Sequence, residues 1–185
     1  MNRKQIPNFI TAIRLILVIP IITSLLTGHY VWAFYLFVLA GVSDGLDGFL
    51  ARRYQWMSKF GAMIDPLADK LLMVLTYLAL GYIGSLPLWL VAIVIGRDLI
   101  IITGAIIYRY LIEEPEYSAT FISKLNTLLQ LALVTFVIFN QVYHLIPQRA
   151  LDIFMYVVAS TTVSSLLDYI WLWGRRAYLV KRDKA

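Results

Sequence analysis

Four aspartates lie inside an otherwise strongly apolar part of the chain. The stretch SDGLDGFLARRYQWMSKFGAMIDPLADK covers residues 43–70, and its aspartates are Asp44, Asp47, Asp65 and Asp69. Residues three or four apart share a helix face, so each pair of aspartates forms one stripe if its segment is helical. Four convergent carboxylates repel one another and lose solvation unless a cation neutralises them. Carboxylate oxygens suit Mg²⁺, Mn²⁺ or Ca²⁺, so the pattern predicts a site for one or two divalent cations.

Small residues and one arginine in the same register suit a phosphate-bearing ligand. Gly48, Ala51 and Gly61 carry little or no side chain, which lets a diphosphate or a base approach the backbone closely. Arg52 borders the first stripe and offers a guanidinium fork for phosphate oxygens. Taken singly, each glycine would be read as a helix-packing residue and the arginine as a membrane anchor. Together with metal-binding carboxylates, one of them able to accept a proton, they favour phosphoryl transfer.

The elements that must position these residues are predicted to be membrane-spanning helices. The chain has 185 residues, of which 61% are hydrophobic and 15% charged, whereas a soluble domain has about 25% charged residues. Six apolar segments are long enough to cross a hydrocarbon core of roughly 30 Å. These segments are residues 7–28, 30–53, 60–83, 87–112, 120–146 and 148–173. We therefore expect an all-α polytopic membrane protein with six transmembrane helices and a single domain over residues 1–185.

The positions of lysine and arginine predict that both termini are cytoplasmic. One side of the predicted bundle collects Arg3, Lys4, Arg52, Arg53, Lys59, Arg109, Lys124, Arg175, Arg176, Lys181, Arg182 and Lys184. The opposite side carries Arg149, and basic residues favour the cytoplasmic side. Asp47 is about 9 Å along its helix from Arg53, at about 1.5 Å per residue, so the site is expected near cytoplasmic headgroup depth. This charge pattern indicates membrane orientation rather than nucleic-acid binding. A chain beginning at Met1 without a transit-like extension suggests a bacterial inner membrane.

The same residues resemble the signature of the CDP-alcohol phosphotransferase family. Residues 44–69 read Asp-x2-Asp-Gly-x2-Ala-Arg-x8-Gly-x3-Asp-x3-Asp and match every fixed position of that signature. In this family a CDP-linked alcohol donates its phosphoryl group to an acceptor hydroxyl and releases CMP. The resemblance implies that all four aspartates bind Mg²⁺ or Mn²⁺, two ions per site, and that Asp69 also accepts the proton of the attacking hydroxyl. It implies a homodimer of six-helix subunits. The residues implied to hold the CDP moiety are Asn8, Gly48, Arg52, Ser58 and Gly61.

Two further stretches resemble the eukaryotic-type cardiolipin synthases of this family. They are GRDLIIITGAIIYRY at residues 96–110 and TFISKLNTLLQLALV at residues 120–134. The related phosphatidylglycerophosphate synthases usually carry a lysine where this chain has Asn126 and an arginine where it has Ala105. An acceptor pocket with fewer cations favours phosphatidylglycerol, whose phosphodiester has one negative charge. Glycerol 3-phosphate has nearly two negative charges and needs more cations to bind it. The resemblance thus implies CDP-diacylglycerol as donor and phosphatidylglycerol as acceptor.

Several alternatives remain open from the sequence. Arg97 and Lys124 are predicted to hold the acceptor phosphate, but Arg97 and Asp98 would also satisfy each other inside the bundle, and Lys124 would also serve as a membrane anchor. A phosphatidylglycerophosphate synthase using glycerol 3-phosphate is the nearest alternative function. A cation transporter is a remote one, because transporter sites usually lie near the bilayer midplane between repeats and at broken helices.

Overall fold

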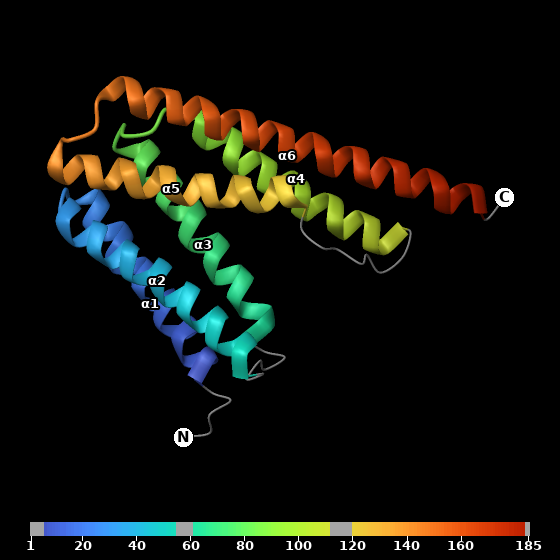
Figure 1. The fold of residues 1–185 in the computed structure, drawn as a ribbon, viewed down its shortest axis with the longest axis horizontal. Helices are drawn as coiled ribbons and strands as arrows, with labels where there is room; N and C mark the ends of the chain where they lie inside the picture. Colours follow the sequence, from blue (N-terminus) through green and yellow to red (C-terminus); the bar gives the residue numbers. More distant parts are fainter. Residues whose placement is uncertain (1–5, 55–60, 112–119, 184–185) are drawn as a thin grey trace. The chain divides into compact units, whose positions relative to one another are not determined.

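The computed structural model describes residues 6–54, 61–111 and 120–183, with side chains over 13–43, Gly45, 67–106 and 120–172. All regular structure in these ranges is helical (Figure 1). The helices are α1 (Ile6–Leu26), α2 (Tyr30–Tyr54), α3 (Gly61–Tyr82), α4 (Leu88–Leu111), α5 (Phe121–Tyr143) and α6 (Gln148–Asp183). The predicted all-α class is confirmed. Helix α6 continues well past its predicted end at residue 173.

Three of the described helices are long and apolar enough to cross a membrane. Three stretches meet the length and composition of a full span: Leu88–Ile106, Phe121–Tyr143 and Gln148–Leu172. Two shorter apolar helical stretches, Ile13–Leu26 and Tyr30–Ser43, lie in α1 and α2. The chain is therefore a membrane protein with multiple apolar helices, and the full count of six spans stays a prediction.

Turn residues follow α1, α3 and α5, within a few residues of the predicted segment ends. Gly28 (φ 78°) follows α1 and Gly84 (φ 75°) follows α3, both in the left-handed region that glycine enters at low cost. His144 (φ 52°) takes the same conformation after α5, and its amide bonds the carbonyl of Asn140.

The described chain forms two compact units. The first contains residues 1–86 and 134–146, and in it α1 packs against both α2 and α3. The second contains residues 87–133 and 147–185, and in it α4 packs along α6. The aspartate-rich stretch belongs to the first unit, whereas Arg97 and Lys124 belong to the second. That residues 1–185 form a single domain stays a prediction.

Candidate active site

The four aspartates lie on helices at the predicted register. Asp44 and Asp47 are in α2, and Asp65 and Asp69 are in α3. Because α1 packs against both helices, all three belong to one packed group. The side chain of Asp69 is described. Of the other predicted site residues in this unit the backbone is described and the side chain is not; they are Asn8, Asp44, Asp47, Gly48, Arg52, Gly61 and Asp65. Ser58 lies outside the described residues. Convergence of the four carboxylates therefore stays a prediction.

Asp69 forms an ion pair with Arg14 of α1. The Nη1 atom of Arg14 donates to Oδ1 of Asp69, across 55 residues of sequence. The Arg14 side chain is 1% exposed and that of Asp69 is 44% exposed. A half-exposed carboxylate is a ligand type suited to Mg²⁺ or Mn²⁺, so this part of the site fits the predicted metal.

Arg14 lies outside the aspartate-rich stretch and is not among the residues predicted for the site from the sequence. A usable signal was present, because Arg14 is a charged residue inside the apolar segment 7–28. An ionisable residue within a membrane span is by default a functional-site hypothesis with a partner to be found.

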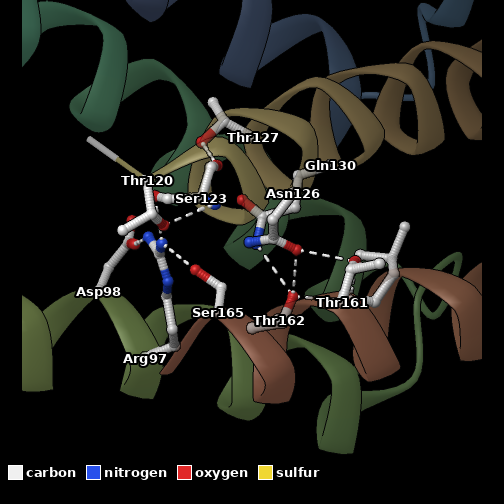
Figure 2. A network of polar contacts seen from close by, with 11 residues as sticks. Arg97, Asp98, Thr120, Ser123, Asn126, Thr127, Gln130, Thr161, Thr162 and Ser165 are labelled. Carbon is white, nitrogen blue, oxygen red and sulfur yellow. Dashed lines mark hydrogen bonds and ion pairs between the residues drawn. The ribbon is translucent and has the colours of Figure 1, made fainter. Parts of the chain in front are cut away.

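Arg97 is the centre of a buried polar network between three helices (Figure 2). It is 6% exposed, and its Nη1 donates to Oδ1 of Asp98 at 2.7 Å. Its Nη2 donates to the hydroxyls of Ser123 on α5 and Ser165 on α6, each at 2.7 Å. The guanidinium carbon also lies 5.8 Å from the ring centroid of Tyr169. The Arg97–Asp98 pairing expected as an alternative is thus present, and a direct acceptor contact of Arg97 stays a prediction.

Lys124 borders a groove on the surface of α5. The groove has a volume of about 360 Å³ and is lined by Ser123, Lys124, Thr127, Leu128 and Leu131. Steps of three or four residues place these side chains on one side of α5. The polar ones lie nearer the start of the helix, and the two leucines lie further along it. Such a groove suits an amphipathic ligand, with an anionic group at the lysine and hydrocarbon along the leucines.

Asn126 lies inside the second unit, away from the groove surface. It is 0% exposed, and its Oδ1 accepts hydrogen bonds from the hydroxyls of Thr161 and Thr162 on α6, each at 2.9 Å. The Nε2 atom of Gln130 donates to the Thr162 hydroxyl at 3.2 Å. This side chain joins α5 to α6 (Figure 2), and the acceptor preference inferred from position 126 stays a prediction.

Comparisons with known proteins agree on one family. The family model described as CDP-alcohol phosphatidyltransferase matches residues 4–166. A Drosophila melanogaster protein named "Probable cardiolipin synthase (CMP-forming)" is 32% identical over 91% of this chain and 58% of its own length. A Homo sapiens protein named "Cardiolipin synthase (CMP-forming)" is 32% identical over 98% of this chain and 65% of its own. The chain thus spans less than two thirds of these relatives.

A relative with a different named activity has a similar percentage identity over a shorter part of this chain. An Oryza sativa protein named "CDP-diacylglycerol--glycerol-3-phosphate 3-phosphatidyltransferase 1, chloroplastic" is 34% identical over 76% of this chain and 48% of its own length. The percentage identity alone does not separate the two activities.

Proposed function

The chain belongs to the CDP-alcohol phosphatidyltransferase family, and we propose that it is a CMP-forming cardiolipin synthase that transfers the phosphatidyl group of CDP-diacylglycerol to phosphatidylglycerol. The observation that carries the choice of acceptor is the extent of similarity. The two cardiolipin synthase relatives align with 91% and 98% of this chain, and the glycerol-3-phosphate phosphatidyltransferase with 76%, at similar identity.

Each group of predicted site residues has its own role in the proposed reaction. A hydroxyl oxygen of phosphatidylglycerol bonds to the phosphorus of the phosphatidyl group, the bond from that phosphorus to CMP breaks, and CMP leaves with the electron pair. Asp69 accepts the hydroxyl proton. Two divalent cations, Mg²⁺ or Mn²⁺, when bound, neutralise charge on the diphosphate and on the leaving CMP. The residues that hold these ions are Asp44, Asp47, Asp65 and Asp69. The residues that hold the donor are Asn8, Gly48, Arg52, Ser58 and Gly61.

The acceptor phosphodiester binds at the groove on α5. Lys124 is exposed and supplies a positive charge beside the hydroxyls of Ser123 and Thr127. Arg97 adds positive charge behind the groove wall, one hydrogen bond away from it through Ser123. Leu128 and Leu131 offer an apolar path for an acyl chain. A lipid with one phosphate charge and long acyl chains matches this combination.

The protein acts in a membrane, with six spans, both termini cytoplasmic, and the active site facing the cytoplasm. The distribution of lysine and arginine supports this orientation, and the apolar stretches of α4, α5 and α6 support the spans. We further propose a homodimer in a bacterial inner membrane.

Phosphatidylglycerophosphate synthase is the second candidate, supported by the 34% identity to the Oryza sativa relative. It differs from the first in the acceptor alone. The transporter alternative has no support, because the family is one of transferases.

One experiment distinguishes the two candidates. Purified protein is given CDP-diacylglycerol with Mg²⁺ or Mn²⁺, and phosphatidylglycerol, glycerol 3-phosphate, inositol or serine is offered in separate reactions. We expect CMP release and cardiolipin with phosphatidylglycerol, and little product with the other acceptors. Efficient use of glycerol 3-phosphate with phosphatidylglycerol ignored would establish the second candidate.

A further inference from the structure

Arg14 occupies a core position of α1 that is otherwise apolar. It begins a stripe with Val18, Ile21 and Leu25, spaced by four, three and four residues. These four residues are 1%, 3%, 0% and 0% exposed. Placing a guanidinium in such a stripe carries a desolvation cost of several kcal/mol, in order-of-magnitude terms. An apolar side chain would pack at this position without that desolvation cost.

One contact of Arg14 is with Asp69, whose carboxylate is the one described among the four aspartates of the predicted active site. Its Nη1 bonds Oδ1 of Asp69, whose side chain is 44% exposed. The buried end of the pair is thus the guanidinium, and the carboxylate lies between this fixed cation and more open space. An ion pair with a fixed guanidinium restricts the broad rotation that an aspartate otherwise has about its terminal torsion.

We propose that Arg14 is a positioning residue for the reaction, holding the Asp69 carboxylate in the orientation that receives the acceptor proton. This rests on the role of Asp69 in the proposed function. Proton transfer is sensitive to such orientation, because catalytic groups must be held within about 0.5 Å of their productive geometry. A purely structural role for the ion pair predicts instead that any loss of activity follows the loss of folding stability.

The test compares five variants: Arg14→Met, Arg14→Lys, Asp69→Asn, the double variant of Arg14→Met with Asp69→Asn, and Val18→Ala. Methionine keeps much of the length of arginine without its charge. Val18→Ala is the matched control, because it removes buried volume one turn along the same stripe and leaves the ion pair intact. The readouts are CMP release at saturating substrate, the KM for CDP-diacylglycerol, and the thermal unfolding temperature in metal-free detergent solution.

We expect Arg14→Met to lower kcat at least tenfold, with the donor KM changed less than threefold. Arg14→Lys should recover part of the lost turnover. In the Asp69→Asn background, Arg14→Met should change kcat less than twofold, because the group that it positions is no longer functional. Shifts in unfolding temperature of the two single variants should likewise be non-additive in the double variant. Val18→Ala should lower the unfolding temperature and keep kcat within threefold.

Three results would overturn the proposal. They are an unchanged kcat in Arg14→Met, an equal fall in kcat in both backgrounds, and an equal fall in kcat in Val18→Ala at a matched loss of unfolding temperature. If Arg14→Met does not fold, the proposal requires that Arg14→Lys loses kcat while its donor KM changes little. Full turnover of Arg14→Lys would then overturn the proposal. Absence of CMP release from wild-type protein with every acceptor would instead contradict the proposed function itself, so the two failures are distinguishable.

Discussion

Arg97 of α4 and Ser123 of α5 are joined by a hydrogen bond of 2.7 Å. Ser123 also lines the groove that carries Lys124, while the same Arg97 nitrogen bonds Ser165 of α6. The two cations predicted for the acceptor phosphate are therefore placed differently. Arg97 is fixed behind the groove wall, and Lys124 is exposed at its surface. Their substitution should have different consequences.

Replacement of Lys124 should weaken acceptor binding. A hydrogen bond to a charged group contributes about 1.5–3 kcal/mol, so Lys124→Gln should raise the KM for phosphatidylglycerol about tenfold or more, with a smaller effect on the donor KM. Initial rates over a range of acceptor concentrations in mixed micelles measure this. Arg149→Gln is the control, because Arg149 is an exposed cation in the first turn of α6 and outside the groove. Equal effects of the two substitutions would indicate a general surface-charge effect.

Replacement of Arg97 should destabilise the fold. Removing one partner of a buried ion pair costs about 3–5 kcal/mol, since the other charge is left without compensation. Arg97→Gln should therefore lower the thermal unfolding temperature more than Ser165→Ala, which removes one hydrogen bond to the charged guanidinium at a cost of about 1.5–3 kcal/mol. Circular dichroism of the detergent-solubilised protein provides the measurement. Comparable unfolding temperatures for both variants would contradict a stabilising role of the network.

Addition of a cation should change acceptor preference at position 128 and not at position 126. Asn126 is fully buried, so Asn126→Lys places an ammonium among the hydroxyls of α6 and should destabilise the protein. Leu128 lines the groove and is 61% exposed, so Leu128→Lys adds a charge beside Lys124 without burying it. We expect Leu128→Lys to raise the rate with glycerol 3-phosphate relative to phosphatidylglycerol by about tenfold, from one charged contact. Product analysis by mass spectrometry with both acceptors present tests this, and an unchanged product ratio would contradict an acceptor site at the groove.

The sequence was sufficient for the order of the helices because most of them are long apolar runs, and turns at Gly28 and Gly84 follow α1 and α3. It did not predict that α6 extends to Asp183. It was also sufficient for the spacing of the aspartates along α2 and α3, which follows from helical periodicity. It did not indicate which side of each helix faces the protein. In a membrane span the lipid-facing and buried residues are both apolar, so Leu128, 61% exposed, and Leu133, 0% exposed, have the same appearance in the sequence.

Tertiary packing explains the remaining differences between prediction and structure. Asn126 was linked to the acceptor by comparison with the lysine that phosphatidylglycerophosphate synthases carry at this position. That comparison does not show that the side chain is buried, roughly 200° around the helix from the exposed Lys124. The pairing of Arg14 with Asp69 joins residues 55 positions apart, and no local pattern encodes it.

Removal of divalent cations should abolish activity. Four acidic side chains at membrane depth need a compensating charge, and the predicted chemistry needs a metal at the diphosphate. CMP release should stop on complete chelation and return when Mg²⁺ or Mn²⁺ is added back. Asp44→Ala and Asp65→Ala should each abolish turnover while the protein keeps its oligomeric state in gel filtration. Activity that survives chelation, or near-normal rates in either variant, would contradict the ligand assignment.

Asp69 should be distinguishable from the other aspartates by its effect on turnover. General acid–base catalysis contributes about 10²- to 10⁴-fold, so Asp69→Asn should lower kcat by at least 10²-fold. Its donor affinity should fall less than that of Asp44→Ala, because asparagine keeps the shape and one oxygen while three carboxylates remain for the metal. Binding of CDP-diacylglycerol is measured by calorimetry in the presence of Mn²⁺, and kcat by CMP release under saturating substrate. An equal loss of donor affinity in Asp69→Asn and Asp44→Ala would make Asp69 chiefly a metal ligand, and the proton acceptor would then have to be sought elsewhere in the site.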